Sequence, residues 1–343
     1  MKRNFFILFT FFTLLAPFTL SAQHQIERTT EVYAIKGQDT LLLDIYLDKI
    51  LATQEARPVM IYVHGGAWSA GSRKNAAQQM FCQHLAETGI VSVAINYRLG
   101  LAEGNIYGAK NMTEVVRLGT EDIIDATLYL LSKKEELNIN SDQIMLSGGS
   151  AGAINSLTLE YDICNDEPYT HRLPEGFNYA GIISQAGCIE ILGNDLHWDK
   201  TPCPMLLMHG DLNGVSDGAL PIVKGKIEVE GMNDHPWGGT LYIDSLLNEI
   251  LAPHWTYIER GADHCIAMKT LTDNHAETDQ FIQEYVLGKR DCIKFTDIRD
   301  KEPVSMNGVE NMVKFAPLYI LGFGKYLEEI DWNNMQAPSQ VVY

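Results

Sequence analysis

The stretch Ser147-Gly148-Gly149-Ser150-Ala151-Gly152 is the most informative part of this sequence. It follows the short apolar run 143–146 and precedes a helix-like stretch at 153–159. A Gly-x-Ser-x-Gly string between a strand and a helix is typical of a nucleophile elbow, a tight turn that strains the serine backbone. A Cβ at either glycine would collide with the strand or the helix. The stretch therefore predicts that the Ser150 hydroxyl stands clear of the sheet at a helix N-terminus, where the helix dipole favours a developing negative charge.

A second glycine-containing segment lies upstream of the elbow. The apolar run 58–63 is typical of a buried strand, and it ends in His64-Gly65-Gly66-Ala67-Trp68. Acyl transfer needs N–H donors where the tetrahedral oxyanion forms, and small residues let backbone N–H groups approach that oxygen closely. We expect these donors to be the N–H groups of Gly65, Gly66 and Ala67, together with that of Ala151 directly after the nucleophile.

The general base is expected to be a histidine that follows a late strand. Residues 255–258 form a short apolar run, Gly261 turns the chain, and His264 follows before a helical pattern at about 277–287. His264 is therefore the predicted base. His64 precedes the nucleophile in the chain, and we expect it to brace its loop instead.

The carboxylate that orients the base has several candidates. The apolar run 204–208 is followed by a segment that contains Asp211, Asn213 and Asp217. The acid must accept a hydrogen bond from His264 Nδ1 and so hold the ring in the right tautomer. Asp211 is favoured because it lies nearest the strand end, where a rigid scaffold positions side chains best. Each of the three can equally be an Asx-turn residue.

The N-terminus has the pattern of a secretory signal peptide. Lys2 and Arg3 precede the almost wholly apolar run 5–20, and small residues close it, which predicts cleavage after Ala22. No later stretch has the apolar length needed to span a membrane. The mature chain is therefore expected to be a secreted or periplasmic protein, with one α/β domain at residues 23–290.

Composition excludes several classes of partner and cofactor. The formal net charge of −18 becomes −20 without Lys2 and Arg3, which argues against a nucleic-acid partner. No His, Cys, Asp or Glu cluster has zinc or calcium spacing and no glycine loop has phosphate-binding spacing, so we expect neither a metal nor another cofactor. The six cysteines are too few for a disulfide scaffold, and their connectivity is open.

The order of the predicted elements indicates an α/β fold. Residues 31–35 and 40–47 are expected to form an edge hairpin. Apolar strands then alternate with helices, which predicts a mostly parallel central sheet with helices on both faces. The expected helices lie at 76–88, 113–137 and 277–287, and the expected later strands at 91–96, 180–185, 205–208 and 255–258. The tail, residues 291–343, is expected to pack on the domain as a C-terminal extension.

Together the segments described above, with Asn96-Tyr97-Arg98-Leu99 and Gly261-Ala262-Asp263-His264, resemble the α/β-hydrolase superfamily over residues 31–289. The chain looks most similar to secreted bacterial carboxylesterases of the feruloyl and acetylxylan esterase type, which share the His-Gly-Gly-x-Trp string. The resemblance implies a Ser–acid–His triad with no metal or organic cofactor. In the family pattern, the position of the triad acid corresponds to Asn213 in this sequence. An amide there cannot stabilise an imidazolium as a carboxylate does.

The expected function is that of a serine carboxylesterase working through an acyl-enzyme. The resemblance implies acetyl or hydroxycinnamoyl esters of plant polysaccharides or oligosaccharides as substrates. Two alternatives stay open. One is an amidase of the arylformamidase type, which also has His-Gly-Gly-x-Trp, and the other is a catalytically impaired binding protein with this fold, which only Asn213 favours.

Overall fold

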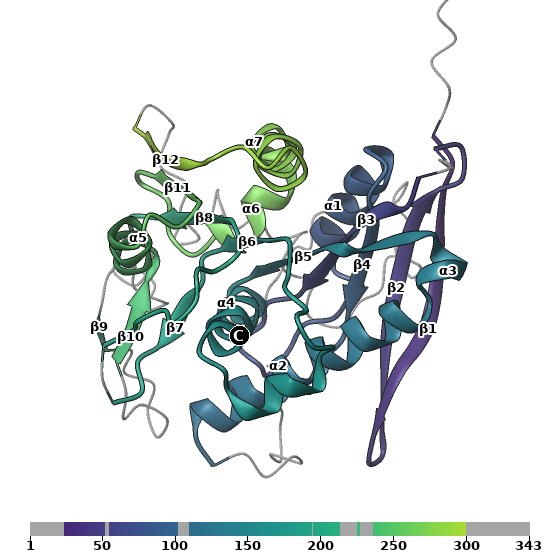
Figure 1. Cartoon of the computed structure of the whole chain (residues 1–343), viewed down its shortest axis with the longest axis horizontal. Helices are drawn as coiled ribbons and strands as arrows, with labels where there is room; N and C mark the ends of the chain where they lie inside the picture. The colour runs from purple at the N-terminus through teal and green to yellow at the C-terminus, as the bar shows by residue number, and fades with distance from the viewer. Residues whose placement is uncertain are drawn as a thin grey trace, which may run out of the picture.

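The computed structural model describes residues 24–51, 55–101, 110–193, 195–212, 225–226 and 236–299. Their central feature is a nine-stranded sheet with the strand order β1-β2-β4-β3-β5-β6-β8-β11-β12, covered by helices on both faces (Figure 1). A small second sheet has the order β7-β10-β9. The predicted fold class, an α/β-hydrolase fold with a mostly parallel sheet and an antiparallel edge hairpin, is confirmed.

The antiparallel part of the central sheet lies at its N-terminal edge. There β1 (Ile26–Lys36) pairs with β2 (Asp39–Asp48), and β2 pairs with β4 (Val91–Ile95). All further pairings are parallel and run through β3 (Arg57–Val63), β5 (Ile139–Gly149), β6 (Gly181–Gln185), β8 (Met205–Gly210), β11 (His254–Glu259) and β12 (Ile293–Ile298). The small sheet consists of β7 (Cys188–Glu190), β9 (Gly225–Lys226) and β10 (Pro236–Gly239).

Parallel strands of this kind are apolar because helices cover both of their faces. Every residue of β4, β6, β8 and β11 is buried. One apolar core lies under α1 (Ala76–Glu87), α6 (Ile266–Asp273) and the π-helical turn Phe281–Leu287 that follows α7 (His275–Gln280). The other core lies under α2 (Met112–Ser132), α4 (Ala151–Cys164) and α5 (Thr240–Glu249). Short helices at Lys134–Leu137 (α3) and Pro168–Arg172 complete the described elements.

Several details differ from the prediction, among them α5 and the small sheet, which were not predicted. The helix expected at 113–137 ends at Ser132, because the Lys133 backbone leaves the helical region and a separate turn, α3, follows. The sheet continues past residue 290, since β12 pairs with β11. Helix α6, directly after the predicted base, was not predicted, because its eight residues are too few for a clear helical period.

Some predictions fall outside the described residues. These are the signal peptide at 1–22, the acid candidates Asn213 and Asp217, and the tail from residue 300 onward. Among the helices that the structure describes, none combines the length and apolarity needed to cross a bilayer.

Candidate active site

Ser150 occupies the turn between β5 and α4, where it is the N-cap of α4. Its backbone has φ 54° and ψ −121°, a conformation that non-glycine residues adopt only at a cost of about 1–3 kcal/mol. The Ser150 N–H donates to the carbonyl of Gln185, 2.8 Å away, so the neighbouring strand β6 holds the turn in place. The strained serine predicted from the sequence is therefore present.

Glycines flank Ser150 because the backbone around it is crowded. A Cβ on Gly152 would lie 2.0 Å from the carbonyl oxygen of Val63 at the end of β3. A Cβ on Gly148 would lie 2.4 Å from the carbonyl carbon of Gly152. Separations below 3 Å are repulsive, so the Gly-x-Ser-x-Gly spacing is a packing requirement of this strand–turn–helix junction.

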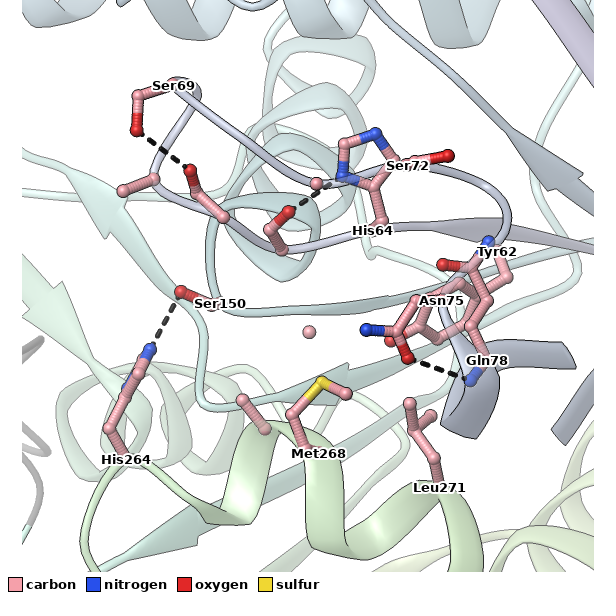
Figure 2. A pocket seen from close by; sticks show the side chains of 16 residues that line it. Tyr62, His64, Ser69, Ser72, Asn75, Gln78, Ser150, His264, Met268 and Leu271 are labelled. Carbon is pink, nitrogen blue, oxygen red and sulfur yellow. Dashed lines mark hydrogen bonds between the residues drawn. The ribbon is translucent and has the colours of Figure 1, made fainter. Parts of the chain in front are cut away.

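His264 lies in the turn between β11 and α6, 114 residues from the serine. Its Nε2 is 2.8 Å from Ser150 Oγ, a hydrogen-bond distance at which the serine hydroxyl can donate to a neutral imidazole (Figure 2). This is the distance at which a base takes a proton from a nucleophile. The structure thus brings together the two residues that the sequence analysis pairs as nucleophile and base.

The loop after β3 lies directly against the elbow. A Cβ on Gly65 would be 3.2 Å from the Ser150 Cβ, so a side chain there would crowd the nucleophile. Gly66, Ala67 and Trp68 all have positive φ, at 116°, 51° and 52°. The loop therefore brings Gly65, Gly66 and Ala67 to the cavity that Ser150 lines.

Ala151 is the first residue of α4. The first amides of a helix have no carbonyl partner within that helix and point outward from its N-terminus. This position agrees with the predicted oxyanion role of the Ala151 N–H.

Side chains without a predicted role hold this loop. The indole Nε1 of Trp68 donates to Asn155 Oδ1 on α4 at 2.9 Å, and both residues are buried. Gly119 on α2 leaves room for that amide, because a Cβ there would be 2.2 Å from Asn155 Nδ2. The tryptophan of the His-Gly-Gly-Ala-Trp string is thus an anchor between the loop and helix α4, whose N-cap is Ser150.

His64 braces the same loop, as expected. Its Nδ1 donates to the Gly65 carbonyl at 2.7 Å, and its ring stacks on Tyr97 with centroids 4.5 Å apart. Burial lowers the pKa of His64 to about 4, although the bond to Gly65 opposes that shift. The imidazole is therefore neutral near pH 7.

The depressed pKa of His64 predicts a loss of stability in acid. Between about pH 6.5 and pH 4 the unfolded chain binds a proton at this site and the folded chain does not, so the free energy of unfolding falls as the pH falls. The full shift corresponds to about 3 kcal/mol. His64→Asn, which keeps a donor but does not titrate, should flatten this part of the slope in urea unfolding at pH 7 and pH 4.5. An unchanged slope would contradict the assignment.

Asp211, the acid favoured by sequence, has other partners in the structure. Its Oδ1 accepts from the Gly261 N–H at 2.6 Å, and its Oδ2 is 3.6 Å from Arg260 Nη1. No hydrogen bond joins Asp211 to His264 within the described residues. Asp211 lies at the end of β8, next to the turn that carries His264. Its bond to the Gly261 N–H holds the backbone of that turn in place.

A cavity of about 270 Å³ extends from Ser150 and His264 into the protein, and we call it the Ser150 cavity (Figure 2). One wall is the loop after β3. The others are the N-terminus of α1, with Asn75 and Gln78, and α6, with Ala267, Met268 and Leu271. The Asn75 cap has a readable signal, an asparagine directly before an expected helix, whereas nothing in the sequence places Gln78 or α6 at the site.

The cysteines take no part in this site. All six lie within the described ranges, and none of them forms a disulfide there. Burial raises the pKa of Cys82 to about 12, so this thiol is not a nucleophile near neutral pH. Within the described ranges, no group of three or more His, Cys, Asp or Glu residues is placed to hold a metal ion.

Comparison with known proteins gives matches to esterases. Residues 43–192 match the family model described as BD-FAE. The chain is 32% identical to venom carboxylesterase-6 of Apis mellifera over 135 residues, which are 38% of this chain and 22% of that protein. It is 32% identical to the probable carboxylic ester hydrolase LipM of Mycobacterium tuberculosis over 148 residues, 42% of this chain and 30% of that protein. The chain thus spans less than a third of these relatives.

Solved structures extend the similarity beyond this region. The apo form of Thermogutta terrifontis esterase 2 matches with a TM-score of 0.54 and 17% identity, over 76% of this chain and 94% of that one. The butyrate-bound form of the same esterase gives a TM-score of 0.54 at 18% identity. Together with the strand order and the elbow, these similarities show that the chain has an α/β-hydrolase fold.

Proposed function

We propose that this protein is a serine hydrolase that cleaves carboxylic esters through an acyl-enzyme. The observation that carries the proposal is the 2.8 Å hydrogen bond between Ser150 Oγ and His264 Nε2 at a strained elbow. Both residues line one cavity with the glycines of the loop after β3. The esterases among the related proteins support an ester as the substrate.

The reaction then follows from the positions of these groups. His264 Nε2 takes the proton of the Ser150 hydroxyl as Oγ attacks the ester carbonyl. The resulting oxyanion receives hydrogen bonds from the Ala151 N–H and from the N–H groups at Gly65, Gly66 and Ala67, where low local polarity makes such bonds strong. His264 next protonates the departing alcohol, which leaves an acyl group on Ser150. A water molecule, deprotonated by His264, releases the acid and restores the serine.

We further propose that the acid of the triad is Asp217. It is the other carboxylate among the candidates after β8, since Asp211 is engaged with Gly261 and Arg260 and Asn213 carries an amide. A carboxylate is needed because it stabilises the imidazolium and fixes its tautomer.

This assignment predicts unequal effects at the three positions. Asp217→Asn should lower kcat by about 10⁴, the effect of an acid-to-amide change in such a triad. Asp211→Asn should cost no more than about tenfold, because an amide oxygen can still accept from the Gly261 N–H. Asn213→Asp should change kcat little. Steady-state kinetics on one ester tests all three. A loss of about 10⁴ at Asp211 with a normal Asp217 variant would reverse the assignment, and a large gain at Asn213→Asp would indicate an impaired triad.

The finer substrate class is also a proposal. The sequence resemblance to feruloyl and acetylxylan esterases supports acetyl or hydroxycinnamoyl esters on plant polysaccharides or oligosaccharides. The N-terminal segment supports export, which would bring the enzyme to such polymers. A panel of acetylated and feruloylated oligosaccharides, assayed for released acid, tests the substrate class.

The hydrolase proposal itself has a simple test. Purified protein should hydrolyse p-nitrophenyl acetate, and a serine-directed phosphonate should abolish that activity in proportion to the fraction of protein labelled. Absence of turnover with a folded protein would favour the binding-protein alternative, and activity that survives full labelling would mean that another group is the nucleophile.

A further inference from the structure

We propose that Gln78 is a specificity-determining residue of the Ser150 cavity, an inference that rests on the proposed hydrolase function. Its amide oxygen would accept a hydrogen bond from a substrate group that has an apolar body and an O–H or N–H donor at its far end. The substrate class is therefore an ester with such a group on either its acyl or its alcohol side.

The cavity has one end at the proposed nucleophile and another at the N-terminus of α1. Ser150 and His264 lie on one side of it, and Asn75 and Gln78 lie on the opposite side (Figure 2). Met268 and Leu271 on α6 line the wall between the two ends. A group held at the nucleophile therefore reaches Gln78 only after crossing an apolar stretch.

Gln78 has an unused acceptor. The residue is 1% exposed, and its Nε2 donates to the Arg73 carbonyl at 3.3 Å. That bond identifies which end of the amide is the nitrogen, because the flipped form would set two oxygens against each other. Its Oε1 is buried and accepts no hydrogen bond from the residues that the structure describes. A buried acceptor without a hydrogen bond is unfavourable. A ligand that donates a hydrogen bond to it removes this penalty and therefore binds more tightly.

In a capping box, a glutamine at the third position of a helix accepts from the N–H of the cap residue, but in α1 that N–H has another partner. Gln78 is the third residue of α1 after the Asn75 cap, where a capping box would direct Oε1 to the N–H of the cap residue. Here the Asn75 N–H donates to the Ser72 carbonyl at 3.2 Å, and Asn75 Oδ1 accepts from the N–H groups of Ala77 and Gln78. Helix capping is thus complete without Gln78 Oε1.

The size of the cavity fits a group with a ring or a short chain. A cavity of about 150 Å³ is sufficient for benzene, so about 270 Å³ accommodates an aromatic ring with a linker and a terminal hydroxyl. The terminal torsion of a glutamine is soft and the 3.3 Å bond to the Arg73 carbonyl is long, so we infer that the amide rotates to bring the buried Oε1 to a donor in the cavity.

Two matched pairs of esters test the inference. On the acyl side the pair is methyl para-hydroxyphenylpropanoate and its para-methyl analogue, which replaces the hydroxyl by a methyl group of similar size. On the alcohol side it is para-hydroxyphenylethyl acetate and its para-methyl analogue. The wild-type enzyme should prefer the hydroxyl member of one pair by about tenfold in kcat/KM, the effect of one neutral hydrogen bond in a desolvated site. The pair that shows this preference identifies the side of the ester that fills the cavity.

Gln78→Met, which keeps the length of the side chain, should abolish or reverse that preference. The control is Gln79→Met on the same helix, because Gln79 Nε2 makes the equivalent bond, to the Lys74 carbonyl at 2.8 Å, and is not among the residues that line the cavity. Gln79→Met should keep the wild-type ratio. Within one variant the ratio of the two esters is independent of how much protein is folded.

Each outcome decides a separate question. If the wild-type enzyme turns over p-nitrophenyl acetate but discriminates in neither pair, the inference is overturned and the hydrolase proposal stands. If Gln78→Met keeps the hydroxyl preference, another residue is responsible and the inference is also overturned. If no ester is hydrolysed, it is the proposed function that fails.

Discussion

Ser150→Ala is expected to lower kcat for ester hydrolysis by about 10⁴ to 10⁶ without unfolding the protein. The hydroxyl is the only group at the elbow positioned to attack, because its Oγ is 2.8 Å from His264 Nε2. Ser150 is partly exposed and its loss creates no buried void, so the fold should persist. The measurement is kcat on p-nitrophenyl acetate, with the circular dichroism spectrum as the check on folding.

A serine on the same helix provides the control for this variant. Ser156 on α4 donates to the Gly152 carbonyl at 2.9 Å and does not line the Ser150 cavity. Ser156→Ala should therefore keep kcat within about a factor of three, with at most a modest loss of stability. Near-normal turnover by a folded Ser150→Ala protein would refute the proposed mechanism.

His264→Ala should be about as damaging as Ser150→Ala, and the double variant should be little worse than either single variant. The serine is a weak nucleophile unless a base removes its proton, so losing either member disables the same step. Such effects are strongly non-additive. The test compares kcat for the two single variants and the double variant under identical conditions.

His171→Ala is the matched histidine control, because His171 is exposed and bonds only weakly to Asp166, at 3.4 Å. It should leave kcat unchanged. If the losses at Ser150 and His264 instead multiply in the double variant, the two residues act independently and His264 is not the base.

Ser150 and His264 could be paired from the sequence, as the proposed nucleophile and base, because their local constraints are strong. The elbow allows only glycine at 148 and 152, where the backbones of β5, α4 and β3 meet. The turn around His264 likewise follows a fully buried strand, β11, whose apolar run is easily read. Patterns of this kind are determined by a few neighbouring residues and are visible without the fold.

The partners of Asp211 and the far end of the cavity could not be predicted because they depend on contacts between distant segments. Asp211 reaches Gly261 and Arg260 only because β8 and β11 are adjacent in register in the sheet. Gln78 meets α6 across the cavity through the packing of α1 on α6, and α6 itself is too short for a clear pattern. Neither relation leaves a periodicity or a motif in the sequence.

The central claim is that Ser150 carries the acyl group during turnover, and a rapid-mixing experiment with p-nitrophenyl acetate tests it most directly. Formation of an acyl-enzyme before its slower hydrolysis releases a burst of p-nitrophenol close to one equivalent of active enzyme. Acid quenching within the burst, followed by peptide mapping, should find the acetyl group on the peptide that contains Ser150, and no burst in Ser150→Ala. A full burst with the acetyl group on another residue, or turnover with an unmodified Ser150, would contradict the account.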